Sequence, residues 1–316
     1  MTPARSSEEE NTMTATTAPL SAHKPHRFGA VALLIATGGV FGAMFPLGKL
    51  ASRAGVAPLA WTLSMLLFGG VILLAMALIR GQAVPVSRLH LAYYAGAGLL
   101  SMGLPNFILF TVMPHLGVGL SSVVYTLPPI LTLAFAAALR MEKPGTQRSL
   151  GIALGFAGAA MIVSQRSHLP SPDLYGWLLL ALAIPTFLAA GNIFRSRFWP
   201  AGSSPLALSA GTMLAGGGWV LLLMLGKGRI GDIASLLDAP LLASIQAALN
   251  ALQFLMFMRL QKAAGPVYVS QVGYVATAAG LASGALVFGE TYSPWIWAAS
   301  ITIAAGVLVV NSARRT

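Results

Sequence analysis

Long apolar segments without charged residues recur along the chain, separated by short segments that carry glycine, proline and single charges. Each is about 20 residues long, the length that an α-helix needs to cross a bilayer. Continuous apolarity rich in Gly and Ala favours packed helices, since barrel strands alternate apolar and polar residues. We therefore predict an all-α membrane protein with ten transmembrane helices. These cover residues 28–48, 57–79, 91–113, 118–139, 149–165, 174–194, 205–226, 239–258, 266–288 and 294–313.

Two of these segments resemble each other at a spacing of 148 residues. The first reads GVGLSSVVYTLPPILTLAFAAALRME over residues 117–142, and the second reads GPVYVSQVGYVATAAGLASGALVFGE over 265–290. Both begin with glycine, contain a serine and a tyrosine in the first half, and end at a lone glutamate, Glu142 or Glu290. A repeat at one fixed spacing predicts a duplicated bundle with a site between its halves.

The composition agrees with a membrane protein. Of 316 residues, 56% are hydrophobic and 9% are charged, and the mean hydropathy is +0.77. A soluble domain would carry roughly 25% charged residues. The absence of cysteine excludes disulfides, thiolate metal sites and cysteine nucleophiles. The polar segments are too short to form a separate nucleotide-binding subunit or domain.

The net charge of +11 does not indicate a nucleic-acid partner, because the basic residues stand singly in short loops. Their distribution predicts the topology, since Lys and Arg concentrate on the cytoplasmic side. With the N-terminus inside, 14 of them are cytoplasmic and 5 are external. The cytoplasmic set is Arg5, Lys24, Arg27, Arg80, Arg88, Arg140, Lys143, Arg148, Arg195, Arg197, Arg259, Lys262, Arg314 and Arg315.

Both termini are then cytoplasmic. Because each repeat has five helices, an odd number, the second repeat enters the membrane from the side opposite to the first. We predict a disordered cytoplasmic tail at residues 1–27 and two inverted five-helix repeats at 28–165 and 174–312. This arrangement places Glu142 near the cytoplasm and Glu290 near the outer surface.

Over residues 28–312 the chain resembles the EamA-like family of the drug/metabolite transporter superfamily. The residues that carry the resemblance are Gly289-Glu290, the glycines of the helices after each glutamate (Gly151, Gly155, Gly158 and Gly306), and Phe41-Gly42 leading to Lys49. In the first repeat Met141-Glu142 replaces the usual Gly-Glu pair. The family contains mostly exporters of amino acids and related metabolites, so the resemblance implies a transporter but not its substrate. We therefore expect an inner-membrane transporter that exports or exchanges a small metabolite such as an amino acid.

Polar residues inside the apolar segments are the candidate binding residues, because each must be hydrogen-bonded or face water. Gln246, Asn250 and Gln253 recur at i, i+4 and i+7, on one helical face. The substrate-binding candidates are Lys49, Asn106, Tyr125, Asn192, Gln246, Asn250, Gln271 and Tyr274. We expect them to face a cavity between helices one, three, four, six, eight and nine. The alternatives are hydrogen bonds between helices for the polar residues, an interfacial anchor for the tyrosines and a structural anchor for Lys49.

All eight carboxylates lie outside the predicted membrane centre, and the five histidines lie in the tail or at helix ends. We therefore expect no hydrolase, no metal and no cofactor, and a cavity that is neutral, or positive if Lys49 faces it. The predicted function is a secondary transporter that works by alternating access, with a small molecule and membrane lipid as its partners. A channel-like facilitator or a non-transporting scaffold is the alternative, and a membrane enzyme ranks below both.

Overall fold

The computed structural model describes residues 27–141, 145–163 and 174–312. Every regular element in these ranges is helical, which confirms the predicted all-α class. The predicted tail at residues 1–27 lies outside the described residues except for Arg27, and Glu142 lies outside them as well.

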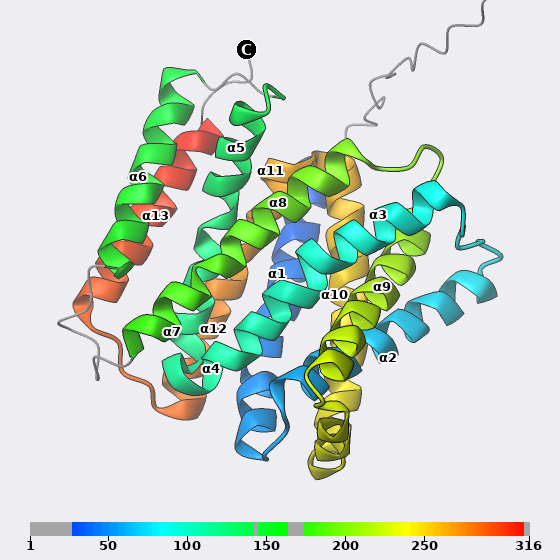
Figure 1. Ribbon diagram of the computed structural model, residues 1–316. Coiled ribbons are helices and arrows are strands. Elements are labelled where there is room, and N and C mark those ends of the chain that lie inside the picture. Colours follow the sequence, from blue (N-terminus) through cyan, green and yellow to red (C-terminus); the bar gives the residue numbers. More distant parts are fainter. Residues whose placement is uncertain (1–26, 142–144, 164–173, 313–316) are drawn as a thin grey trace, which may run out of the picture.

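The elements follow the chain as two similar series (Figure 1). The first is α1 (Arg27–Arg53), α2 (Pro58–Ile79), α3 (Arg88–Gly98), the π-helical turn η1 (Leu99–Gly103), α4 (Leu104–Val123), the 3₁₀ turn η2 (Val124–Thr126), α5 (Pro128–Ala138) and α6 (Thr146–Val163). The second is α7 (Leu174–Ala181), α8 (Ala183–Arg197), α9 (Pro205–Gly226), the 3₁₀ segment η4 (Ile230–Asp238), α10 (Pro240–Ala264), α11 (Pro266–Ser270), α12 (Val272–Phe288) and α13 (Pro294–Ser312).

Seven helical segments of the described chain are long and apolar enough to cross a membrane, which supports a multi-pass protein. They are Gly29–Arg53, Pro58–Ile79, Arg88–Ala138, Leu174–Arg197, Pro205–Gly226, Pro240–Ala264 and Pro266–Phe288. The third has 51 residues, whereas one crossing needs roughly 20. It contains two predicted spans, 91–113 and 118–139, that follow each other without a polar loop. The arrangement of ten crossings in two repeats stays a prediction.

The backbone breaks in the same way at the two glycines that open the repeated segments. Gly117, within α4, has φ 79° and ψ 174°. Gly265, between α10 and α11, has φ 86° and ψ 176°. This region of φ and ψ is essentially restricted to glycine, because a Cβ atom would clash with the backbone. The sequence repeat at 148 residues therefore coincides with a repeat in backbone conformation.

Helices α2 and α9 also match, with 22 residues each and a proline at the first position. A Cβ atom on Gly70 would collide with Leu214, and one on Gly217 would collide with Leu67. The two contacts are related by a fixed offset of 147 residues, because 214 − 67 and 217 − 70 are each 147 and each contact joins one position to the equivalent of the other. Along α2, Leu67 contacts Gly217 and Gly70 contacts Leu214, so the residue numbers on α9 fall as those on α2 rise. The two helices therefore pack antiparallel around an approximate two-fold axis.

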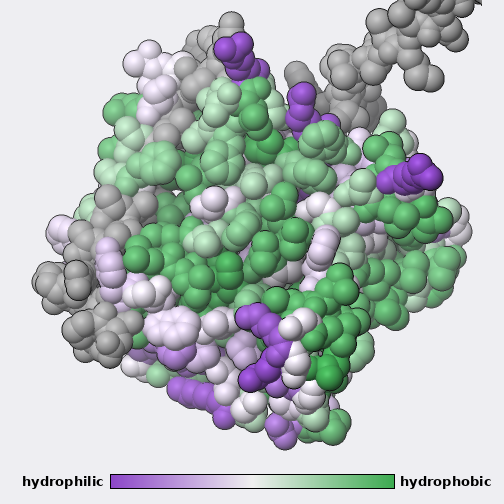
Figure 2. Space-filling model, viewed as in Figure 1, coloured by the Kyte–Doolittle hydropathy of each residue, from purple (hydrophilic) through white to green (hydrophobic). Residues whose placement is uncertain are grey.

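The outer surface is apolar over a wide area. Figure 2 shows hydrophobic residues across much of the visible face and the most hydrophilic ones mainly towards its upper and lower parts. Leu286, Ile301 and Leu308 on α12 and α13 are among the exposed large apolar side chains. Such a surface is typical of helices in contact with lipid, where backbone groups are satisfied within each helix.

Candidate functional site

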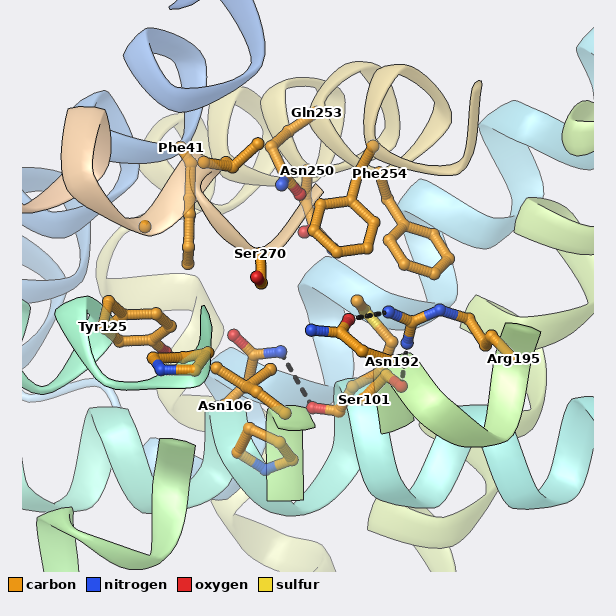
Figure 3. A pocket seen from close by; sticks show the side chains of 17 residues that line it. Phe41, Ser101, Asn106, Tyr125, Asn192, Arg195, Asn250, Gln253, Phe254 and Ser270 are labelled. Atoms are coloured by element: carbon orange, nitrogen blue, oxygen red, sulfur yellow. Dashed lines mark hydrogen bonds between the residues drawn. The ribbon is translucent and has the colours of Figure 1, made fainter. Parts of the chain in front are cut away.

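A cavity of about 60 Å³ lies inside the bundle. Figure 3 shows the side chains around it, which come from both halves of the chain. They belong to six segments, namely α1, η1–α4, η2–α5, α8, α10 and α11–α12. The sequence predicts a cavity between the same six segments. The lining residues are Phe41, Ser101, Met102, Pro105, Asn106, Tyr125, Pro128, Leu188, Asn192, Arg195, Asn250, Gln253, Phe254, Phe257, Ser270, Val272 and Gly273.

Aromatic rings form one side of this cavity. The ring of Tyr125 packs edge-on against Phe41, with the centroids 5.0 Å apart and an interplanar angle of 84°. Phe45 contacts the same tyrosine at 5.5 Å. The backbone of Tyr125 closely approaches Gly273 of α12, where a Cβ atom would collide with its carbonyl oxygen. The rings are thus fixed at the contact between the two halves, as packed aromatic pairs favour.

Amide side chains add hydrogen-bonding capacity. Asn106 Nδ2 donates to the carbonyl oxygen of Met102 at 2.8 Å, and Asn250 Nδ2 donates to that of Met65 at 3.3 Å. Within the described chain, neither side-chain oxygen accepts a hydrogen bond, and the Gln253 side chain makes none. Because a buried amide oxygen is costly to leave unpaired, these acceptors suit a polar ligand or water.

Arg195 is the charged group of the cavity and is 1% exposed. Its Nε donates to Gln261 Oε1 at 2.7 Å, and its Nη2 donates to Asn192 Oδ1 at 2.6 Å. Nη1 contacts the Ser101 hydroxyl. The guanidinium carbon lies 5.1 Å from the centre of the Phe257 ring, in a cation–π contact. These four partners come from three different segments and fix the orientation of the guanidinium group.

The local backbone makes this arrangement possible. Ser101 lies in the π-helical turn η1, and such turns interrupt α-helices frequently at functional sites. Gly191 of α8 faces it, and a Cβ atom at that position would collide with the Ser101 hydroxyl. Gln261 Nε2 also donates to the Asn192 carbonyl oxygen and to Ser196 Oγ, both at 3.0 Å. A glycine, a π-turn and a buried glutamine therefore hold α8 close to its neighbours.

From the sequence, Arg195 is expected in a short cytoplasmic loop, but it lies buried in the last turn of α8, so the loop position is wrong and the cytoplasmic side stays a prediction. Helix α8 continues to Arg197, three residues beyond the predicted end at 194. Arg195 lies one helical turn after Asn192 and therefore on the same face. The i, i+3 spacing of Arg195 from the candidate residue Asn192 is the sequence signal that could have identified it.

The structure brings four of the eight sequence candidates to the cavity: Asn106, Tyr125, Asn192 and Asn250. The other four, Lys49, Gln246, Gln271 and Tyr274, do not line it. Tyr274 donates from its hydroxyl to the Thr126 carbonyl oxygen at 3.1 Å, across the two halves.

The fully buried Gln246 places its Nε2 3.7 Å from the sulfur of Met65. Its Oε1 has no partner among the described residues. Lys49 is half-buried on α1, and Gln271 precedes the first residue of α12. The cation that reaches the cavity is thus Arg195, and the positive charge comes from α8 instead of α1.

A second polar cluster lies where α12 ends. Glu290 accepts hydrogen bonds from the backbone N–H groups of Val118 at 2.8 Å and Gly119 at 2.9 Å. The Tyr292 hydroxyl donates to the same carboxylate at 2.9 Å. Burial and this hydrogen bond raise the pKa of Tyr292 well above its ordinary value. Glu290 thus caps the helical turn that begins after Gly117, as anions do at helix N-termini.

Residues 28–164 match the model of the EamA-like transporter family. These residues belong to that family. The resemblance predicted from the sequence is thereby confirmed over residues 28–164, and the family implies a membrane transporter of the drug/metabolite type. No curated protein matches the chain.

A solved structure described only as "Crystal structure of protein" is 19% identical in sequence and has a TM-score of 0.57. The match covers 92% of this chain and 100% of the other. At this identity the likeness shows a shared fold and nothing of the substrate. The EamA-like match over residues 28–164 implies a membrane transporter, and the apolar helices support a multi-pass membrane protein.

Proposed function

We propose that this protein is an inner-membrane secondary transporter that exports or exchanges a small metabolite by alternating access. The observation that carries the proposal is the cavity itself, which is lined by polar residues from both halves of the chain. A site at the contact between two halves opens to either side when the halves rock against each other.

Two inverted five-helix repeats, at 28–165 and 174–312, are the proposed moving parts. The antiparallel α2–α9 contact and the matching glycine breaks at Gly117 and Gly265 support this arrangement. Glu290 provides a contact between the halves at one end, since it joins the end of α12 to the break in α4. We propose that these hydrogen bonds form and break as access alternates.

The test is counterflow with the purified protein in proteoliposomes. Vesicles are loaded with an unlabelled metabolite, and the transient uptake of the same labelled metabolite is followed for a panel of amino acids and small organic acids. A transporter gives saturable uptake above the equilibrium level, which protein-free vesicles do not show. Unsaturable flux without counterflow indicates a channel-like facilitator, and absence of flux for every metabolite indicates a scaffold. Either result contradicts the proposal.

A further inference from the structure

We propose that Arg195 binds a carboxylate group of the transported molecule, so that the protein selects small monocarboxylates with an apolar body. This inference rests on the proposed function of the cavity and specifies its substrate class.

Arg195 is almost fully buried, and among the described residues no carboxylate lies within ion-pair distance of it. A cation in the interior of a helical membrane bundle is costly and is normally paired or exposed to a water-filled cavity. The contacts to Gln261, Asn192 and Ser101 use three of its N–H donors and leave the charge without a counter-ion. A bound anion supplies that counter-ion.

A guanidinium group has five N–H donors, and the contacts to Gln261, Asn192 and Ser101 use three of them. One N–H on each terminal nitrogen of Arg195 is left, in a side chain that lines the cavity. Carboxylates bind such groups through both oxygens. Because Phe257 and the three polar partners already hold the guanidinium in place, little further ordering is needed on binding.

The charge of the cavity favours a carboxylate over a phosphate. Arg195 is the single ionised group among the described residues that line the cavity. One positive charge balances one carboxylate, whereas a phosphate ester carries about −1.5 to −2 at neutral pH. Figure 3 shows Arg195 on one side of the cavity and Phe41 and Tyr125 on the opposite side. A molecule that spans the cavity therefore presents its charge to the arginine and its apolar part to the rings.

The test measures thermal stabilisation of the purified full-length protein by matched acids and amides. The pairs are phenylacetate and phenylacetamide, 3-phenylpropanoate and 3-phenylpropanamide, and L-phenylalanine and L-phenylalaninamide, with phenyl phosphate as the competing anion. We expect at least one acid to raise the Tm and to bind about tenfold or more tightly than its amide, as a charge-assisted hydrogen bond requires. Binding of no acid, equal binding of acid and amide, or tighter binding of phenyl phosphate overturns the proposal.

Two substitutions at Arg195 test whether the preference for acids over amides depends on this side chain. Arg195→Met removes the charge, and Arg195→Lys keeps the charge but loses the planar donor pair, so we expect both to lower the acid affinity about tenfold or more. The matched control is Arg197→Met on the same helix, where the arginine is exposed. Unchanged acid affinity in Arg195→Lys, or equal loss in Arg197→Met, contradicts the assignment. The comparison of acids with amides needs no variant and stands even where Arg195→Met fails to fold.

Counterflow in proteoliposomes separates this inference from the proposed function. If acids and amides exchange equally and Arg195→Lys has no effect, the protein is a transporter and the carboxylate site is wrong. If acids bind through Arg195 but no metabolite crosses the membrane, the site is correct and the proposed function is wrong.

Discussion

At the scale of single residues, the chemistry of the cavity depends on which polar groups are already paired within the protein. Asn250 faces the cavity with a free amide oxygen, whereas Tyr274 donates its hydroxyl to the Thr126 carbonyl oxygen. Both are sequence candidates for substrate binding. The structure gives them different surroundings, and substitution is expected to give different results.

We predict that Asn250→Leu lowers the counterflow rate and leaves the Tm within a few degrees of the wild type. Loss of one hydrogen bond to a neutral group costs about 0.5–1.5 kcal/mol, which corresponds to roughly a two- to tenfold weaker apparent affinity. Tyr274→Phe is expected to lower the stability by about 1 kcal/mol, because the Thr126 carbonyl loses its donor, with transport per folded molecule unchanged. A transport defect in Tyr274→Phe without loss of stability would contradict this distinction.

The second residue-scale prediction concerns pH. The pKa of Tyr292 is raised above its ordinary value of 10.0 by burial and by the hydrogen bond to Glu290. Below pH 10 the phenol is neutral in both the folded and the unfolded protein, so its contribution to stability is fully present. Above about pH 10 the unfolded state loses its proton first, and stability falls as the pH rises towards the folded pKa.

Thermal unfolding of wild type and Tyr292→Phe between pH 7 and pH 11 checks this prediction. The difference in Tm between the two proteins is expected to be constant up to about pH 9 and to shift in favour of Tyr292→Phe above about pH 10. A difference that varies between pH 7 and pH 9 would show that another group near Tyr292 titrates instead.

At the scale of helices, the two glycine breaks decide where one helix stops and the next begins. Gly117 combines a positive φ with a close approach to the carboxylate of Glu290, and a Cβ atom would lie 2.7 Å from Glu290 Oε1. The break also frees the N–H groups of Val118 and Gly119 for the same carboxylate. Backbone conformation and capping at this position therefore depend on each other.

We predict that Gly117→Ala destabilises the protein by about 1–3 kcal/mol, since alanine is strained in this conformation and displaces Glu290. The matched control is Gly39→Ala in α1, where no atom lies within 4 Å of the added Cβ and where alanine favours the helix. Thermal denaturation in detergent measures both variants. Equal Tm values for Gly117→Ala and wild type would mean that the chain adopts another backbone conformation at this glycine.

At the scale of the whole molecule, the antiparallel α2–α9 contact relates these two helices by an approximate two-fold axis. Antiparallel packing of equivalent helices is what inverted repeats produce, and an odd number of crossings in each repeat is needed for the inversion. The charge distribution of the sequence predicts the orientation in the membrane. The prediction at this scale is therefore the topology.

We expect reporter fusions at Gly81 and after Arg314 to report the cytoplasm, and fusions at His168 and Gly231 to report the outer side. Full-length expression of each fusion is the control for correct insertion. If Gly81 and His168 report the same side, the ten-helix arrangement is wrong. If all four report the opposite side, the repeats stand and the orientation is reversed.

The sequence by itself determined the helical membrane class and the segments that surround the cavity, and it predicts the two repeats. These follow from local quantities. Continuous apolar runs fix the helices, because backbone groups in lipid must be paired within the segment. The repeated glycines fix equivalent breaks, because only glycine adopts the backbone conformation of Gly117 and Gly265.

Only the tertiary structure decided which polar side chains reach the cavity. Gln246 shares a helical face with Asn250, yet it packs against Met65, and Arg195 is buried although its charge is typical of a loop. The rotation of each helix and the position of its end depend on contacts between distant segments, such as that of Gly191 with Ser101. A buried cation is tolerated when neighbouring helices supply its hydrogen-bond partners, and those neighbours are adjacent in space and not in the sequence.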